Sequence, residues 1–193
     1  MSQKQRIVLA SGNAHKIKEI GQMLKDFEVV GMKQLGFDKE IEENGTTFYE
    51  NALIKAKTVA EALNLPALAD DSGICVDALN GAPGIYSARY AGDGNDKHNN
   101  ELLLKNMEGI TDRRAKFVCC MVFYKPNGEI VTATGETFGE IMFNTQGENG
   151  FGYDPLFFSY DLNKCLGVAS AEEKNKISHR FRAINALKDK LRD

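Results

Sequence analysis

Long apolar segments and export signals are both lacking in this sequence of 193 residues. The longest apolar runs, such as residues 117–124, are far shorter than the ~20 residues that a membrane helix needs. Residues 1–10 include a lysine and an arginine, but no extended apolar region and no small-residue cleavage site. We therefore expect a cytoplasmic protein that does not span a membrane.

Cysteine is sparse, and the four present show no C-x-x-C spacing: Cys75, Cys119, Cys120 and Cys165. Cys119 and Cys120 are neighbours in an apolar run, so in a strand their side chains point to opposite faces. We expect reduced and mostly buried thiols, as is usual for proteins of the cytosol.

An excess of positive charge is also lacking, because 24 Lys and Arg stand against 27 Asp and Glu, a net charge of −3. The protein as a whole thus has no electrostatic reason to bind nucleic acid or an anionic membrane, and an RNA-binding module is disfavoured. The P-loop pattern G-x-x-x-x-G-K-[ST] is absent as well. A polyanionic ligand would have to be held by a local cluster of cations.

No internal repeat, low-complexity tract or flexible linker interrupts the chain, and we expect residues 1–193 to form a single domain. Helical periodicity near both ends, with strand-like sequence between, predicts an α/β fold with a mixed sheet. Strands are expected at 6–10, 67–69, 116–124 and 129–137, the last two as a hairpin around 125–128. Four helices are expected. The first has an apolar stripe at Ile17, Ile20 and Leu24, and the second begins at a capping box at Thr47. The third covers residues 96–107, and the last begins after Ser178.

The first candidate site is the turn between the first strand and the first helix, Ser11, Gly12, Asn13, Ala14, His15 and Lys16. Backbone N–H groups at a helix N-terminus attract anions, the serine and asparagine add donors, and the lysine adds positive charge. The alternative is an ordinary helix N-cap, for which serine and asparagine are also favoured.

Lys55 and two pairs of carboxylates form the second group of candidates. Lys55 shares or borders the apolar face of its helix, so it either snorkels to solvent or points into a site that needs a cation. Glu42 and Glu43 precede a glycine turn, and Asp70 and Asp71 are expected to end a short apolar strand. Adjacent strand residues face opposite ways, so only one aspartate can face a given cleft. Carboxylates at strand ends suit Mg²⁺.

The third candidate is the segment 150–155, Gly-Phe-Gly-Tyr-Asp-Pro. Glycines on both sides of Phe151 allow close backbone approach and leave the face of the ring open, so that a purine could stack on it. A tight turn with a phenylalanine in the core is the alternative.

The fourth candidate is the segment 174–180. Ser178 can cap the last helix, which puts His179 and Arg180 in its first turn, where cations oppose the helix dipole. This placement indicates a nearby anion or another functional demand, and a surface helix rich in Lys and Arg is the alternative.

Six motifs in this order make the chain resemble the inosine triphosphate pyrophosphatase family. They are Ser-Gly-Asn-x-x-Lys, Thr-Phe-x-Glu-Asn-Ala, Ala-Asp-Asp-Ser-Gly, Gly-Ala-Pro-Gly-Ile-Tyr-Ser-Ala-Arg-Tyr, Phe-Gly-Tyr-Asp-Pro and Glu-Glu-Lys-x-x-Ile-Ser-His-Arg. Each motif alone is a weak signal, whereas all six together are specific, and the match runs essentially end to end. Residues 163–170 depart from the pattern, since they lack Phe-Ala-Glu-Leu before Glu-Glu-Lys.

The resemblance implies a long mixed β-sheet flanked by helices, two lobes with a central cleft, and a homodimer. It also implies Mg²⁺-dependent hydrolysis of non-standard purine nucleoside triphosphates (ITP, dITP, XTP, dXTP) to the monophosphate and pyrophosphate. One alternative is a related pyrophosphatase that acts on modified pyrimidine or other abnormal triphosphates. Another is a non-catalytic nucleotide-binding regulator, which would not need a base beside the α-phosphate.

Carried over residue by residue, the turn at 11–16 and Lys55 would bind the triphosphate. Asp71 would bind Mg²⁺ and act as general base, with Glu42 preferred over Glu43 as the second metal carboxylate. The other implied residues would line the nucleotide site: Ser72, Phe151, Gly152, Tyr153, Asp154, Lys174, His179 and Arg180.

Overall fold

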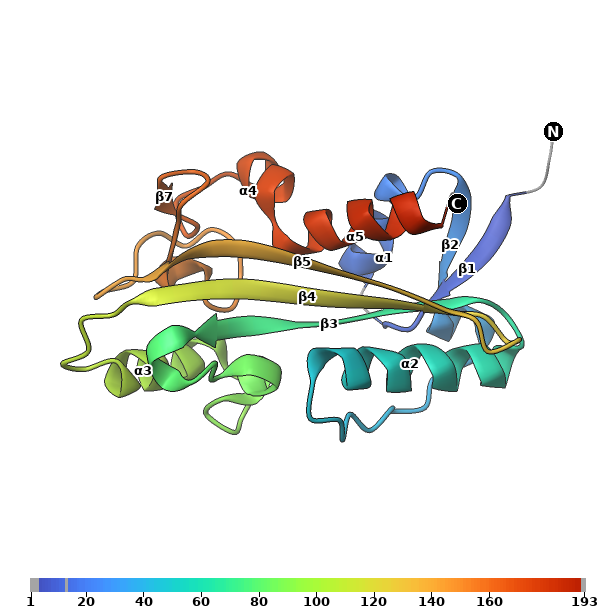
Figure 1. Cartoon of the computed structure of the whole chain (residues 1–193), viewed down its shortest axis with the longest axis horizontal. Helices are drawn as coiled ribbons and strands as arrows, with labels where there is room; N and C mark the ends of the chain where they lie inside the picture. Colours follow the sequence, from blue (N-terminus) through green and yellow to red (C-terminus); the bar gives the residue numbers. More distant parts are fainter. Residues whose placement is uncertain (1–3, 13, 192–193) are drawn as a thin grey trace. The chain divides into compact units, whose positions relative to one another are not determined.

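The computed structural model describes residues 4–12 and 14–191, except for the side chains of His15 and Glu19 (Figure 1). Its strands are β1 (Gln5–Leu9), β2 (Phe27–Gly31), β3 (Ala67–Val76), β4 (Arg114–Tyr124), β5 (Ile130–Ile141), β6 (Phe157–Ser159) and β7 (Lys164–Cys165). In the described part of the chain these strands form one sheet in the order β2-β1-β3-β4-β5-β6-β7. β1 is parallel to β2 and β3, whereas β6 is antiparallel to β5 and β7. The predicted α/β fold with a mixed sheet is confirmed.

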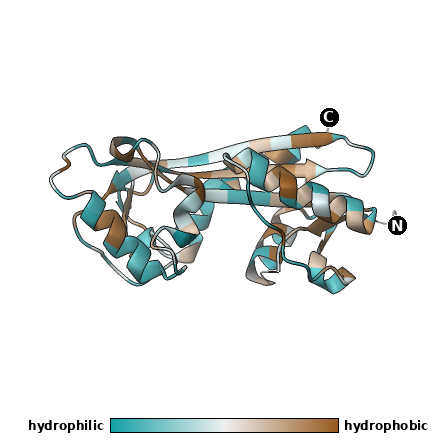
Figure 2. Ribbon diagram, turned by 90° about the horizontal axis from the view of Figure 1, so that it is seen from below, coloured by the Kyte–Doolittle hydropathy of each residue, from teal (hydrophilic) through white to brown (hydrophobic). Residues whose placement is uncertain are grey.

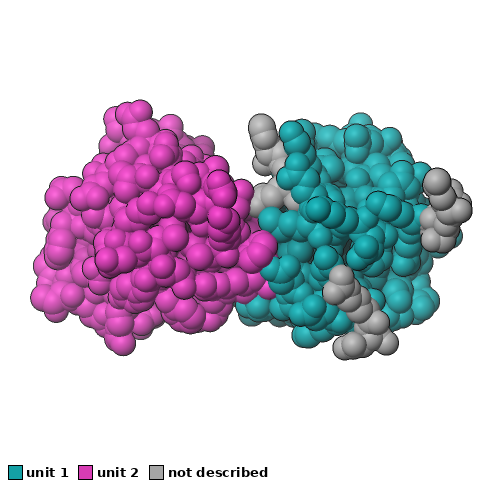
Figure 3. Space-filling view, turned by 90° about the horizontal axis from the view of Figure 1, so that it is seen from above, with its two compact units in different colours: residues 1–71, 120–134, 183–193 teal, residues 72–119, 135–182 magenta. Residues whose placement is uncertain are grey.

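The chain divides into two compact units (Figure 3). Unit 1 comprises Met1–Asp71, Cys120–Thr134 and Ala183–Asp193, and unit 2 comprises Ser72–Cys119 and Gly135–Arg182. β3, β4 and β5 each contribute residues to both units. The single domain over residues 1–193 stays a prediction.

Unit 1 contains the helices α1 (Ala14–Met23) and α2 (Phe48–Leu63) and the short 3-10 helix η1 (Met32–Leu35). α2 begins where the capping box predicted, because the Thr47 side chain accepts a hydrogen bond from the N–H of Glu50. The buried side of α2 packs into a core cluster that includes Val8, Ala52, Ala56, Val59 and Val122. Hydrophobic and hydrophilic residues are interleaved along the helices, as amphipathic packing requires (Figure 2).

Unit 2 contains α3 (Asp96–Asn106), α4 (Ala171–Ile177), the 3-10 helices η2 (Asp77–Leu79), η3 (Gly84–Arg89) and η4 (Asp154–Leu156), and the start of α5 (His179–Lys190). The Ser178 hydroxyl accepts from the N–H of Phe181 at 3.1 Å, which confirms the predicted cap of the last helix. α4 was not predicted as a separate helix. It begins at a capping box of Ser170 and Glu173.

The predicted position of the aspartate pair in β3 is wrong. Asp70 and Asp71 lie inside a ten-residue strand, not at the end of a short one. The strand continues because Ile74 and Val76 are fully buried in the core of unit 2, so the Asp-Asp-Ser-Gly sequence is held extended between two apolar segments. The two carboxylates are therefore fixed by a strand, which is more rigid than a loop.

All four cysteines are free thiols and three are buried, as predicted. Cys119 and Cys120 are both buried although they face opposite ways, because β4 is an interior strand of the sheet. Among the residues that the structure describes, no helix is long and apolar enough to cross a membrane.

Candidate functional site

Asp71 has a side chain that is only 14% exposed and two polar partners from α2. Its Oδ1 atom lies 3.8 Å from Nζ of Lys55, and its Oδ2 atom accepts from Nδ2 of Asn51 at 3.2 Å. Burial raises the pKa of Asp71, and the charge of Lys55 and the Asn51 hydrogen bond offset this only in part. A carboxylate with a raised pKa is a better proton acceptor, and its negative charge attracts a cation.

Lys55 links Asp71 to a second carboxylate, which belongs to Glu43. Nζ of Lys55 lies 2.8 Å from Oε2 of Glu43, and the lysine side chain is 15% exposed, so it points into the site and does not snorkel to solvent. Glu42, the residue preferred from the sequence, is exposed. Glu43, the alternative that the sequence left open by one residue, is therefore the glutamate that contacts Lys55. Glu42 or Glu43 as the second metal carboxylate stays a prediction.

Asn51 was missed by the sequence reasoning, although it holds the acidic loop against Asp71. Its side chain is 1% exposed, and its Oδ1 atom accepts from the N–H of Gly45 at 2.9 Å. A Cβ atom at position 45 would come within 2.7 Å of that oxygen, so only glycine permits the contact. The available signal was its spacing, because Asn51 precedes Lys55 by one helical turn.

Asp70 binds Lys16, the last residue of the predicted anion-binding turn. Nζ of Lys16 donates to both carboxylate oxygens, at 2.8 and 3.0 Å, and Asp70 is 5% exposed. Asp70 and Asp71 therefore take partners from different helices, α1 and α2, as expected of neighbours in a strand. The pairing of residues 54 positions apart could not be predicted from local pattern.

A cavity of about 440 Å³ lies in unit 1 beside these groups. The residues of the predicted site that line it are Ser11, Gly12, Lys16 and Lys55, together with Glu43 and Asp70. Ala14 begins α1 and is exposed, whereas Asn13 and the His15 side chain lie outside the described part of the structure. The structure thus brings Ser11, Gly12, Lys16 and Lys55 together around a space lined by charges of both signs. Their binding of a triphosphate stays a prediction.

The segment 150–155 in unit 2 presents an open aromatic ring, because Phe151 is 64% exposed. Its N–H donates to Oδ2 of Asp154 at 2.9 Å, and Asp154, which is 2% exposed, also binds Lys174. Nζ of Lys174 lies 4.3 Å from the centre of the Phe151 ring. Gly150 has φ +77°, and a Cβ there would meet Oδ2 of Asp154 at 2.0 Å, so glycine is required. Lys174 reaches this group although residues 163–170 depart from the family pattern.

Other predicted nucleotide-site residues are more enclosed. Tyr153 is buried, and its hydroxyl donates to the carbonyl of Ser87 at 2.6 Å, so this side chain anchors the loop to η3. The ring of His179 is mostly buried and stacks on Phe117, with 5.1 Å between ring centres. Arg180 and Ser72 are half-buried.

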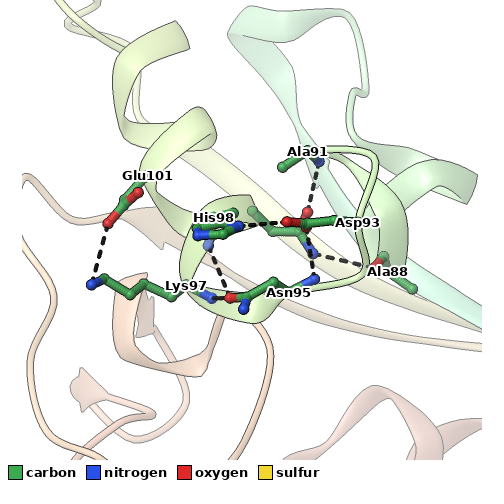
Figure 4. A network of polar contacts seen from close by, with 8 residues as sticks. Ala88, Ala91, Asp93, Asn95, Lys97, His98 and Glu101 are labelled. Carbon is green, nitrogen blue, oxygen red and sulfur yellow. Dashed lines mark hydrogen bonds and ion pairs between the residues drawn. The ribbon is translucent and has the colours of Figure 1, made fainter.

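The start of α3 holds Gly152 from both sides, a feature that the sequence did not reveal. Oδ2 of Asp96 accepts from the N–H of Gly152 at 2.8 Å, and Nδ2 of Asn100 donates to its carbonyl at 2.9 Å. The helix start is itself well ordered, because Asn95 caps it and Asp93 pairs with His98 (Figure 4). The pKa of Asp93 is lowered by that hydrogen bond.

Two carboxylates, Asp71 and Glu43, are the candidate metal ligands. Among the described residues no group of three or more His, Cys, Asp or Glu side chains could hold a metal ion. Mg²⁺ at phosphate sites takes one or two protein carboxylates and completes its shell with phosphate oxygens and water. The two carboxylates fit this mode of binding.

Comparison with known proteins identifies the family of the chain. Residues 7–190 match the Ham1 family. The dITP/XTP pyrophosphatase of Haemophilus influenzae is 51% identical over 97% of this chain and 100% of its own length. That of Clostridium perfringens is 46% identical over 97% of each chain.

Solved structures agree. The Staphylococcus aureus Ham1 protein superposes with a TM-score of 0.93 and 46% identity, covering 97% of this chain and 98% of that one. A nucleoside-triphosphatase / dITP/XTP pyrophosphatase from Mycobacterium abscessus superposes with a TM-score of 0.83 and 39% identity, covering 95% of this chain and 98% of that one. Sequence and fold thus agree over nearly the whole length, and the chain belongs to the Ham1 family.

Proposed function

We propose that this protein is a nucleoside-triphosphate pyrophosphatase that hydrolyses ITP, dITP, XTP and dXTP to the monophosphate and pyrophosphate. The names of its relatives support the substrate class. The observation that carries the chemistry is Asp71, a carboxylate with a raised pKa beside Lys55 and Glu43. A base next to a cation is what attack of water on a phosphate requires.

In the proposed reaction Asp71 accepts a proton from the water that attacks the α-phosphorus. Lys55 lies against the base and contacts the phosphate there, while the turn at 11–16 and Lys16 bind the phosphates that leave as pyrophosphate. Asp71 and Glu43, in place of Glu42, would hold Mg²⁺, which when bound neutralises charge on the phosphate oxygens. Asp70 keeps Lys16 in position.

Selection of the base is assigned to residues of unit 2. Phe151 offers the face on which a purine stacks, which adds affinity without discriminating among bases. Lys174, His179 and Arg180 supply donors, which suit the O6 acceptor of hypoxanthine and xanthine but meet the amino group of adenine. Buried donors left unpaired by the wrong base are the physical source of selectivity.

The proposal includes a homodimer in the cytoplasm, as the family resemblance implies. Light scattering after size-exclusion chromatography measures the oligomeric state directly. Two other functions remain as alternatives, a pyrophosphatase for abnormal pyrimidine triphosphates and a non-catalytic regulator.

A substrate panel tests the proposal. With Mg²⁺, kcat/KM for ITP and XTP should exceed that for ATP, GTP and UTP by at least ~10²-fold, because the site pairs with O6 and N1–H. Pyrophosphate and orthophosphate are measured separately, and hydrolysis in ¹⁸O-water should label the monophosphate. Equal rates for ITP and UTP would favour the pyrimidine alternative, binding without turnover would favour the regulator, and label only in orthophosphate would exclude attack on the α-phosphorus.

A further inference from the structure

Four lysines line the cavity of unit 1, and two of them already have carboxylate partners. Lys16 binds Asp70, and Lys55 binds Glu43. Lys33 and Lys39 also line the cavity, and neither forms an ion pair with any residue in the described ranges. These two lysines are therefore the cavity cations that form no ion pair within the described chain, although Asp38 and Glu40 also line the cavity.

Lys33 is distinguished from Lys39 by its position over the turn at 11–16. It belongs to η1, a short helical turn fixed at its start by a hydrogen bond from the N–H of Gly31 to Oε1 of Gln34. A Cβ atom built on Gly12 would lie 2.8 Å from Cε and 3.1 Å from Nζ of Lys33. The end of the Lys33 side chain therefore lies beside the backbone of Gly12, in the space that a side chain at position 12 would enter. Both lysines are exposed, but Lys39 lies in the irregular segment after η1.

We infer that Lys33 is a further substrate-binding residue, which contacts the β- and γ-phosphates that leave as pyrophosphate. The inference rests on the proposed function, in which Asp71 marks the α-phosphorus. Lys55, which contacts Asp71, lines the cavity, whereas Asp71 does not, so the reacting phosphorus lies at the edge of the cavity. The interior, with Lys33 over Gly12, is left for the two distal phosphates. Lys16 and Lys55 are held by carboxylates, whereas Lys33 forms no ion pair in the described chain, so its ammonium group can turn to a phosphate without breaking one.

Product inhibition tests which phosphates Lys33 contacts. Lys33→Ala should weaken inhibition of ITP hydrolysis by inorganic pyrophosphate about tenfold, the size of one charge-assisted contact, and leave inhibition by IMP within about twofold. Lys33→Arg should restore most of the pyrophosphate affinity, because it keeps the charge. Calorimetric titration with inorganic pyrophosphate gives the same comparison without turnover.

Two matched lysine variants serve as controls. Lys57→Ala removes an exposed lysine of α2 that pairs with Glu61, and it should leave both inhibition constants unchanged. Lys39→Ala removes a charge from the cavity wall without touching Gly12, and its effect on pyrophosphate should be smaller than that of Lys33→Ala.

The outcomes separate this inference from the proposed function. Unchanged pyrophosphate affinity in Lys33→Ala, equal losses for pyrophosphate and IMP, or equal effects of the Lys33 and Lys39 variants would each overturn the contact. A wild-type protein that binds pyrophosphate through Lys33 but does not hydrolyse ITP would overturn the proposed function alone.

Discussion

Two neighbouring aspartates of β3 carry the same chemical group in different environments. Asp70 is almost fully buried and receives two hydrogen bonds from Lys16. Asp71 is also mostly buried, but its nearest cation, Lys55, lies closer to Glu43 than to Asp71. Burial therefore dominates at Asp71 and raises its pKa. The difference follows from the alternation of the strand, and it supports our proposal that Asp70 positions Lys16 and that Asp71 accepts the proton.

Asp71→Asn should lower kcat by at least ~10²-fold while leaving the protein no less stable. A carboxyl whose folded-state pKa lies above its unfolded value stabilises the fold fully only below the unfolded pKa, and this stability is lost as the pH rises through the folded pKa. At pH 7 the ionised Asp71 therefore costs stability, which the neutral amide avoids. The melting temperature, measured without nucleotide or metal, should be equal or higher than that of the wild type.

Asp70→Asn is the matched control, in which we expect a lower melting temperature and a smaller loss of activity. It removes the charge partner of Lys16, so the melting temperature should fall, because breaking a buried ion pair leaves one charge uncompensated. Its activity should fall less than that of the Asp71 variant. A stable, fully active Asp71→Asn protein would be incompatible with the assignment of the base.

At the scale of elements, local signals predicted where helices begin, and tertiary contacts decided the rest. Thr47 and Ser178 cap helices as their sequences indicate, because a cap depends on neighbours within one turn. β3 was predicted too short, since the burial of Ile74 and Val76 in unit 2, which keeps Asp-Asp-Ser-Gly extended, is a tertiary contact. Glu43 was not preferred over Glu42 because the loop that contains both has no periodicity from which the direction of a side chain could be predicted.

The start of α3 acts as a clamp on the loop that carries Phe151. Asp96→Ala removes the acceptor of the Gly152 N–H, so KM for ITP should rise about five- to tenfold, while kcat changes less, because stacking serves the ground and transition states alike. Asp96→Asn keeps a carbonyl oxygen in place and should restore KM. Steady-state kinetics with ITP measures both variants.

A control variant on α3 distinguishes loss of the Gly152 hydrogen bond from a general loss of helix stability. Glu101→Gln alters an exposed ion pair with Lys97 on the same helix and should leave KM unchanged. If Asp96→Asn raised KM as much as Asp96→Ala does, the charge at the helix start, not the hydrogen bond to Gly152, would explain the effect.

At the scale of the whole molecule, each unit has a buried cluster of its own, and three strands run through both units. The buried clusters of unit 1 and unit 2 have no residue in common, yet β3, β4 and β5 contribute to both units. The sequence predicted one domain because no linker interrupts it. It could not reveal a separate buried cluster in each unit, since membership of a cluster depends on contacts between residues far apart in the chain. β3, β4 and β5 run without interruption from one unit into the other, so we expect that loss of these strands in one unit weakens them in the other.

This coupling predicts a single cooperative unfolding transition, and two matched leucines test it. Leu24 in unit 1 and Leu103 in unit 2 are both fully buried, and replacing either with alanine should cost about 2–5 kcal/mol. Because the chain has no tryptophan, calorimetry with hydrogen exchange is the suitable measurement. In each variant the one transition should move to lower temperature, and exchange should rise in both units. A Leu103→Ala protein that showed two transitions, with protection in unit 1 unchanged, would mean that the units unfold independently and that the single-domain prediction is wrong.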